Sequence, residues 1–425
     1  MSRPAVHDEY RASRAWIITE SALAYFVSIL VSGAYLARIT AGLGFSDSLT
    51  GILSSFVSLG CLFQLASLFL FRNMRSAKRP VMLCNLITEL MFVLIYLAPI
   101  VELSQKQKTV IFLIAYCMSM VLQNIMQANK TTWTFSLIDD RKRGIFSARN
   151  EMVSLLGGMA FTYIMGSFID RFEAEGDVRM AYIAGAITLV ILAAVHTVSI
   201  LSIREKPVEE VQDTGLFESL RHLFGDKNIL RIVMIRVLWC IADGCARPFY
   251  GAYQIRELGF SMTFVSVLSI LYSVVRISVS PRIGRYADKH SFVKMSYLCF
   301  CIAGLSYLVN CFTVPSNGKI MYTLYFCLYA VSMGGINSSV TNLIFENVGA
   351  EYRRNALALN SALGGLAGFL ATCAMSPVVS MIQNNGNRIF GIPMYAAQFA
   401  SIVGFVMTAV LVVYMQVCVI GRGKK

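Results

Sequence analysis

The sequence predicts an all-α membrane protein in which twelve transmembrane helices form two pseudo-symmetric bundles of six, with both termini in the cytoplasm. Composition is the first observation: of 425 residues, 56% are apolar and 14% are charged, against about 45–50% and about 25% in soluble domains. The second is that the apolar residues form long runs, since roughly 20 of them suffice for one helical crossing of a bilayer. The third is a repeat that relates the two halves of the chain.

Twelve apolar runs follow one another along the chain. They are 21 to 30 residues long and lie at about 16–38, 48–71, 80–101, 109–138, 144–169, 179–203, 229–256, 260–283, 292–312, 319–347, 355–382 and 392–419. None of them alternates as the strand of a membrane barrel does. The first run is too long for a signal-peptide core and lacks a small-residue cleavage site, so we expect the N-terminus to stay attached.

The basic residues predict the orientation. The 37 Lys and Arg exceed the 24 Asp and Glu, which gives a formal net charge of +13. Most of them fall in alternate connections, at 1–15, 72–79, 139–143, 204–228, 282–291 and 348–354, and at the C-terminus. Basic loops mark the cytoplasmic side, where they face an anionic leaflet. We therefore expect a multi-pass protein of the plasma membrane whose partner is the lipid bilayer and not nucleic acid.

The longest connection, 204–228, divides the chain into an N-terminal six-helix bundle, 1–203, and a C-terminal six-helix bundle, 229–425. Apolar residues recur in this linker at helical spacing, at Leu216, Phe217, Leu220, Leu223 and Phe224. This spacing predicts a short amphipathic helix that lies on the inner leaflet and tethers the bundles.

The two halves repeat each other in sequence. The stretch LGFS at 43–46 recurs at 258–261, and the charged stretches DRKR at 140–143 and EYRR at 351–354 occupy matching places. Two halves of equal topology predict a parallel repeat about an axis along the membrane normal. The commonest use of such a repeat is a transporter whose site lies between the halves, although a duplicated channel or enzyme could also show it.

Together with the central linker and the six-plus-six arrangement, one basic motif makes the chain resemble the major facilitator superfamily. The stretch GRYADKH at 284–290 resembles the family's G-x-x-x-D-R/K loop, whereas its first-half counterpart FLFRNMR at 69–75 has neither the Gly nor the Asp. The family's intramembrane Arg in the fourth helix and the Gly-Pro signature of drug–proton antiporters are absent too. The resemblance implies a gating role for Gly284, Arg285, Asp288 and Lys289. It also implies that the first, fourth, seventh and tenth helices line a central cavity.

Polar side chains form a stripe along the seventh run and along its repeat partner, the first run. At 100° per residue, side chains spaced by three or four positions share one helix face. The predicted cavity residues of these two runs are Arg236, Asp243, Arg247 and Tyr250 in the seventh, beside Cys240, and Tyr25, Ser28, Ser32 and Tyr35 in the first, beside Ser21. Alternatively, Asp243 and Arg247 only neutralise each other at i, i+4.

Three further runs contribute candidate cavity residues. These are Gln123, Asn124, Gln127 and Lys130 in the fourth run, Arg276 in the eighth, and Asn337, Asn342 and Glu346 in the tenth. The amides could bind a solute or could join helices to one another. The charged side chains could face the cavity or could extend along the helix to the interface.

Carboxyl groups inside the predicted spans are candidate proton carriers, because charges there are costly and normally face protein or water. Asp243 is the first choice, since it lies near mid-bilayer on the cavity stripe, although a firm Arg247 partner would keep it ionised. The remaining candidates are Glu151, Glu89 and Glu20. Glu20 lies close to the inner end of its run, which favours a gate or interface role.

These features predict a secondary active transporter, a monomer that moves a small organic solute by alternating access together with a proton. The surplus of Lys130, Arg236, Arg247 and Arg276 over the acidic residues favours an anion or zwitterion. A multidrug or metabolite exporter of the same fold is an alternative, and a membrane receptor or scaffold is one from another class. We expect neither an enzyme nor a cofactor, and no metal site, because the 4 His are scattered and the 11 Cys fall in apolar runs.

Overall fold

The structure is a computed structural model that describes residues 9–70, 76–138, 143–205, 225–349, 352–389 and 391–421. These residues form two compact units, which consist of Met1–Val31, Ala66–Met165 and Phe172–Glu210 in the first and of Ser32–Leu65, Gly166–Arg171 and Val211–Lys425 in the second. The predicted linker helix at 216–224 lies outside the described residues. The units do not follow the predicted division at the linker, because 32–65 and 166–171 group with the C-terminal part.

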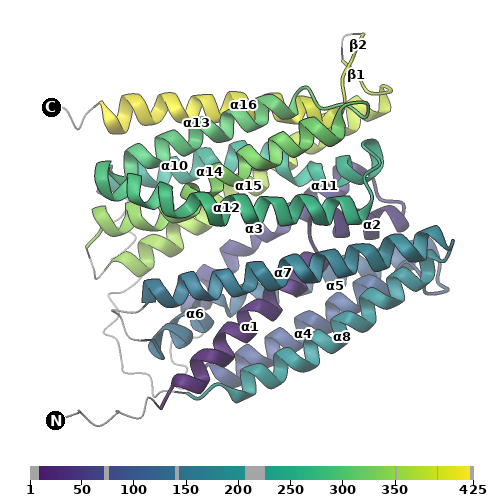
Figure 1. Ribbon diagram of the computed structural model, residues 1–425, viewed down its shortest axis with the longest axis horizontal. Coiled ribbons are helices and arrows are strands. Elements are labelled where there is room, and N and C mark those ends of the chain that lie inside the picture. The colour runs from purple at the N-terminus through teal and green to yellow at the C-terminus, as the bar shows by residue number, and fades with distance from the viewer. Residues whose placement is uncertain are drawn as a thin grey trace. The chain divides into compact units, whose positions relative to one another are not determined.

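The first unit is built from helices that pack along their lengths. Its helices are α1 (Arg11–Leu30), α4 (Lys78–Leu97), α5 (Gln105–Ile125), α6 (Gln127–Ser136), most of α7 (Arg143–Ala174) and α8 (Val178–Ser202). Helix α4 packs against α5 and α8, and α8 packs against α1 (Figure 1). The ring of Tyr96 on α4 lies where a Cβ on Gly185 of α8 would be, and its hydroxyl donates to the Leu30 carbonyl at 2.7 Å. This arrangement holds α1, α4 and α8 close together.

The second unit contains the remaining elements, and two pairs of long helices dominate its packing. Its elements are α2 (Gly33–Gly42), most of α3 (Asp47–Leu70), α10 (Lys227–Ala246), η2 (Arg247–Phe249), α11 (Tyr250–Ala252), η3 (Tyr253–Glu257), α12 (Met262–His290), α13 (Phe292–Asn310), α14 (Gly318–Asn347), α15 (Arg353–Asn384), β1 (Arg388–Ile389), β2 (Ile392–Pro393), α16 (Ala396–Tyr414) and η4 (Met415–Ile420). Helix α10 packs on α15, and α13 packs on α14 (Figure 1). The two short strands pair antiparallel as a hairpin.

Three of the predicted runs are interrupted instead of continuous, and one of them, predicted at 109–138, divides at Met126 between α5 and α6. The run predicted at 16–38 is broken between α1 and α2, where Ser32 is extended and Gly33 has φ +54°. The run predicted at 229–256 changes to the 3₁₀ segment η2 at Arg247–Phe249, where Pro248 starts a new helical turn. Proline lacks the N–H that a continuous helix needs, and glycine readily adopts positive φ.

The repeated LGFS stretch forms the same turn in both copies. Gly44 has φ 71° and Gly259 has φ 64°, the left-handed conformation that glycine tolerates. The serine that follows then caps a helix, since the Ser46 hydroxyl accepts from the Leu49 N–H and the Ser261 hydroxyl from the Phe264 N–H, each at 3.2 Å. The sequence repeat is thus a structural repeat at this point.

Within the described part of the chain, nine helices are long and apolar enough to cross a membrane, or ten if α1 and α2 together form one span. Helix α10 is not among them, and its sequence carries Arg231, Arg236 and Asp243. The predicted total of twelve spans therefore stays a prediction. Arg236 and Asp243 of these charged residues belong to the predicted polar stripe.

Candidate functional site

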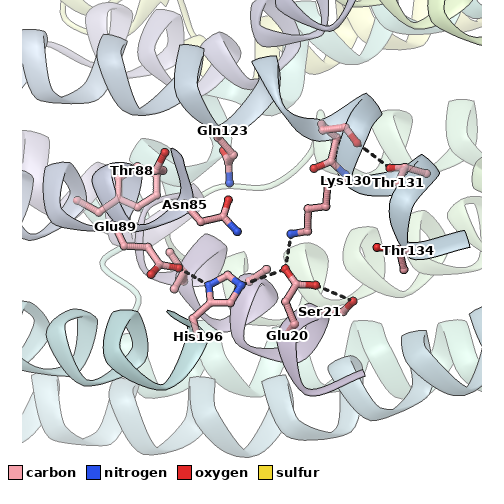
Figure 2. A pocket seen from close by; sticks show the side chains of 14 residues that line it. Glu20, Ser21, Asn85, Thr88, Glu89, Gln123, Lys130, Thr131, Thr134 and His196 are labelled. Carbon is pink, nitrogen blue, oxygen red and sulfur yellow. Dashed lines mark hydrogen bonds and ion pairs between the residues drawn. The ribbon is translucent and has the colours of Figure 1, made fainter. Parts of the chain in front are cut away.

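The first unit encloses a cavity of about 330 Å³ (Figure 2). It is lined by Glu20, Ser21, Ala24, Val27, Asn85, Thr88, Glu89, Phe92, Gln123, Gln127, Lys130, Thr131, Thr134 and His196. These residues come from α1, α4, α5, α6 and α8. A volume of this size is at the lower end of the range for small-molecule sites, about 300–1,000 Å³.

A histidine between two carboxyl groups forms the centre of this cavity. The His196 ring contacts Glu20 Oε1 through Nε2 at 3.0 Å and Glu89 Oε1 through Nδ1 (Figure 2). Lys130 Nζ forms an ion pair with the same Glu20 oxygen, and the Ser21 hydroxyl lies 3.5 Å from the other one. Only 2–3% of Glu20, Glu89 and His196 is exposed. We call Glu20, Glu89, Lys130 and His196 the histidine cluster.

The geometry of the histidine cluster fixes how many protons it must hold. An ionised carboxylate only accepts hydrogen bonds, and a neutral imidazole has one donor and one acceptor. Both ring nitrogens of His196 face carboxyl oxygens, so both contacts can be hydrogen bonds only if one extra proton is on the imidazole or on a carboxyl group. With that proton, two carboxylates are balanced by Lys130 and the extra positive charge. The cluster is thus a buried site for one proton.

Sequence reasoning found three members of the histidine cluster but missed His196. Glu20, Glu89 and Lys130 were predicted separately, as proton carriers and as a cavity residue, and the structure brings them together. His196 is 176 residues from Glu20 and 107 from Glu89. The signal that could have found it is an imidazole in the interior of an apolar run, at 179–203.

The other predicted residues of the first unit divide between the cavity wall and the helix packing. Gln123 and Gln127 line the cavity, whereas Asn124 is buried and donates to the Met120 carbonyl at 2.8 Å. Tyr25 packs where a Cβ on Gly158 would be, and the Ser28 hydroxyl donates to the Tyr25 carbonyl at 2.7 Å. These three side chains are absent from the lining. Glu151 on α7 is exposed and does not line the cavity either.

In the second unit, Asp243 and Arg247 lie in an aromatic setting. Asp243 Oδ1 accepts from the hydroxyls of Tyr307 at 2.9 Å and Tyr329 at 2.8 Å, and Asp243 Oδ2 is 3.4 Å from Arg247 Nη1. The Arg247 guanidinium also donates to the Tyr329 hydroxyl at 2.7 Å and lies 5.1 Å from the centre of that ring. We call these four residues the tyrosine cluster. Donors and a fixed cation stabilise the ionised form of a carboxyl group, so this geometry favours the pairing alternative for Asp243.

The remaining cavity predictions of the second unit are spread over several helices. Tyr250 is buried and its hydroxyl is 2.6 Å from that of Ser401. Arg236 lies against the position that a Cβ on Gly364 would occupy, and Arg276 interacts with Tyr272 of the same helix. Of the others, Ser32, Asn337 and Glu346 are exposed, Asn342 is half-buried and Tyr35 is buried. Their role as a cavity wall stays a prediction.

The predicted gating loop is helical. Gly284, Arg285 and Lys289 are exposed residues in the last turns of α12, which ends at His290. The Asp288 side chain lies outside the described residues. The helix runs through the stretch because no residue after Pro281 breaks it, and Lys289 and His290 suit the negative end of a helix dipole.

An ion-pair cluster that the sequence did not predict joins segments of both sequence halves within the second unit. Arg256 pairs with Asp47 and donates to the Phe45 carbonyl at 2.8 Å, and Gln383 donates to Asp47 at 2.6 Å. Burial and the nearby Asp47 carboxylate raise the pKa of Glu257, which follows the predicted span at 229–256. The sequence signal that could have indicated this cluster is the position of its charged residues, because Asp47 directly follows one copy of the LGFS stretch and Arg256 precedes the other.

The arrangement of membrane-length helices, the internal repeat and a polar cavity among the helices are typical of a solute carrier. The model of the Major Facilitator Superfamily matches residues 21–372, and the chain belongs to this family. The chain is therefore a multi-pass membrane protein of the transporter type, as its sequence resemblance indicated. No curated protein matches the chain in sequence.

Solved structures of transporters share the fold at low sequence identity. The nucleoside transporter NupG matches with a TM-score of 0.70 at 13% identity, over 95% of this chain and 98% of that chain. A D-xylose–proton symporter matches with a TM-score of 0.71 at 15% identity, over 96% and 97%. The fucose–proton symporter FucP of E. coli matches with a TM-score of 0.60 at 13% identity, over 95% and 97%.

Proposed function

We propose that the protein is a secondary active transporter of the plasma membrane that carries a small polar organic solute by alternating access and couples this movement to a proton. The bundles 1–203 and 229–425 would be the two moving parts, with both termini in the cytoplasm. The contact of α2 with α11, where Gly33 and Gly251 approach closely, supports this because it joins segments of both halves. The symporters among the structural neighbours fit the same mechanism.

The histidine cluster carries the proton part of the proposal. Glu20, Glu89 and His196 of this cluster are buried, share one proton by geometry and line a cavity large enough for a small solute. A buried group of this kind can load and release a proton when water reaches it from one side and then from the other. Glu20 and Glu89 thereby become stronger candidates than Asp243, whose partners are an arginine and two tyrosine hydroxyls and include no histidine.

The test is accumulation driven by a pH gradient in liposomes that contain the full chain. A gradient of one pH unit stores about 1.4 kcal/mol, which supports about a tenfold solute gradient if one proton accompanies each solute molecule. We expect His196→Gln to exchange solute across the membrane but to lose accumulation, since Gln keeps a donor and an acceptor and cannot titrate.

His290→Gln is the matched control. His290 is exposed, stacks on Tyr286 at the end of α12 and does not belong to the lining of the cavity. This variant should accumulate solute as the native chain does. Accumulation that survives in His196→Gln would overturn the proton assignment, and a native chain that moves none of a broad panel of solutes would favour the scaffold alternative.

A further inference from the structure

Three polar atoms on one face of α4 have no hydrogen-bond partner among the described residues. They are Asn85 Nδ2, Thr88 Oγ1 and Glu89 Oε2, and all three are buried. Their residues are spaced i, i+3 and i+4, which places them together on one helix face, and each of them lines the cavity. A buried polar atom without a partner costs about 1–3 kcal/mol. A cost repeated on neighbouring turns indicates a binding surface and not a packing surface.

Thr88 departs from what other threonines in these helices do. The hydroxyls of Thr109, Thr131 and Thr188 each donate to the carbonyl four residues earlier, at 2.8–3.0 Å. That local bond is the usual way to satisfy a helical hydroxyl. Thr88 is only 3% exposed and still does not make it. Its hydroxyl therefore remains available for a group inside the cavity.

The chemistry of the three atoms selects the group that can satisfy them. Asn85 Nδ2 only donates, an ionised Glu89 Oε2 only accepts, and Thr88 Oγ1 does both. A hydroxyl group matches this set, because it accepts from Asn85 and donates to Glu89. A carboxylate has no proton to donate, and an ammonium group has no lone pair with which to accept.

The charges of the cavity point the same way. Lys130 pairs with Glu20, and one proton on the histidine cluster balances Glu89, so the lining carries no net charge that would favour an ion. Of the four basic residues that favoured an anion from sequence, only Lys130 lines this cavity, and it is paired with Glu20. In Figure 2 the amide ends of Gln123 and Asn85 point toward one another, which adds uncharged hydrogen-bonding groups beside the same space.

We propose that Asn85, Thr88 and Glu89 form a subsite for a hydroxyl group of an uncharged, polyhydroxylated solute. This inference rests on the proposed function, since it takes the cavity to be the place where the transported solute binds. It goes further by assigning the solute class and the α4 residues that select it.

The first experiment needs no ligand. Thr88→Val and Asn85→Leu remove unpartnered polar atoms from the purified full chain in detergent, so the midpoint of thermal unfolding should stay the same or rise. Thr372→Val is the matched control, because the buried Thr372 hydroxyl donates to the Gly244 carbonyl at 2.7 Å on another helix; its midpoint should fall. A clear fall for Thr88→Val would show a structural role and overturn the subsite.

The second experiment compares solutes of one shape and three charges. Glucose, glucuronate and glucosamine form one such series, and a pentitol and a nucleoside, each with a carboxylate and an amine analogue, form two more. We expect a neutral member to raise the unfolding midpoint most at millimolar concentration. Thr88→Val and Asn85→Leu should each weaken that binding about tenfold, which corresponds to about 1.4 kcal/mol.

The outcomes separate the subsite from the proposed function. The subsite proposal fails if a charged member binds most tightly, if no member of any series binds, or if the α4 variants leave binding unchanged. If a charged solute is accumulated and its accumulation still requires His196, the proposed function stands and only the solute class is wrong. If a neutral solute binds through α4 and is never accumulated, the proposed coupling fails and the subsite stands.

Discussion

The histidine cluster of the first unit and the tyrosine cluster of the second unit both place an acidic residue beside a basic one, yet their chemistry differs. Asp243 has an arginine and two tyrosine donors for its oxygens, and arginine does not titrate in proteins. Glu20 and Glu89 share one lysine and one histidine, and a histidine titrates near neutral pH. The comparison teaches that the partners of a carboxyl group decide whether it can carry a proton.

Glu20→Gln should have the largest effect on this comparison. It leaves the Lys130 ammonium, whose side chain is 18% exposed, without its carboxylate, and breaking such a buried pair costs about 3–5 kcal/mol. We expect a strong fall in the unfolding midpoint. Adding Lys130→Met should recover most of the loss, because the unpaired charge is then gone.

Glu9→Gln provides the control for this cycle. Glu9 pairs with Arg204 at 3.1 Å, but both side chains are more than 60% exposed, and surface pairs contribute about 0–1 kcal/mol. Its midpoint should scarcely change. If the double variant were no more stable than Glu20→Gln alone, Lys130 would not depend on Glu20 for its charge balance.

Asp243→Asn should have a moderate effect on stability and little effect on coupling. The amide oxygen can still accept from Tyr307 and Tyr329, and Arg247, 47% exposed, keeps its bond to Tyr329. We expect a loss of about 1–2 kcal/mol and an unchanged ratio of solute across a pH gradient. If Asp243→Asn lost accumulation and still exchanged solute, Asp243 would be the proton carrier, as the sequence alone suggested.

The fold could be predicted much further from sequence than the site. Composition, run length and the repeated LGFS stretch depend on local patterns, and they predicted a membrane protein with two repeated halves, which share the turn at Gly44 and Gly259. The resemblance carried by the motif at 284–290, the central linker and the six-plus-six arrangement then led to the correct family. The break before Gly33 was missed, because a glycine and serine inside an apolar run are compatible with a continuous helix as well as with a break.

The site was predicted only in pieces because its members meet through tertiary packing. Periodicity placed Gln123, Gln127 and Lys130 on one face of their helix, and all three line the cavity. It could not show that Lys130 faces Glu20, or that His196, 176 residues after Glu20 and 107 after Glu89, completes the cluster. Counting charges could not show that Lys130 is the only one of the four predicted basic residues in the lining of this cavity, or that it is paired with Glu20.

Tyr307→Phe should have a smaller effect and should sharpen the contrast between the clusters. It removes one of two hydroxyl donors to Asp243 Oδ1, while Tyr329 continues to donate. The expected loss is about 1 kcal/mol of stability, with no change in the pH dependence of transport. A shifted pH profile would mean that the ionisation of Asp243 contributes to coupling.

Glu257→Gln should give the smallest effect, and its sign depends on pH. Burial and Asp47 raise the pKa of Glu257 in the folded protein, so ionisation of this carboxyl group destabilises the folded state. The destabilisation is fully present above the pKa in the folded protein and disappears below the pKa in the unfolded protein. The partly exposed position limits it to about 0.5 kcal/mol or less. We therefore expect Glu257→Gln to raise the unfolding midpoint slightly at about pH 8 and to leave it unchanged at about pH 3, where Glu and Gln at this position are both neutral. The control is Glu102→Gln at an exposed position, which should leave the unfolding midpoint unchanged at both pH values. A fall at the higher pH would show that the Glu257 carboxylate stabilises the ion-pair cluster around Arg256.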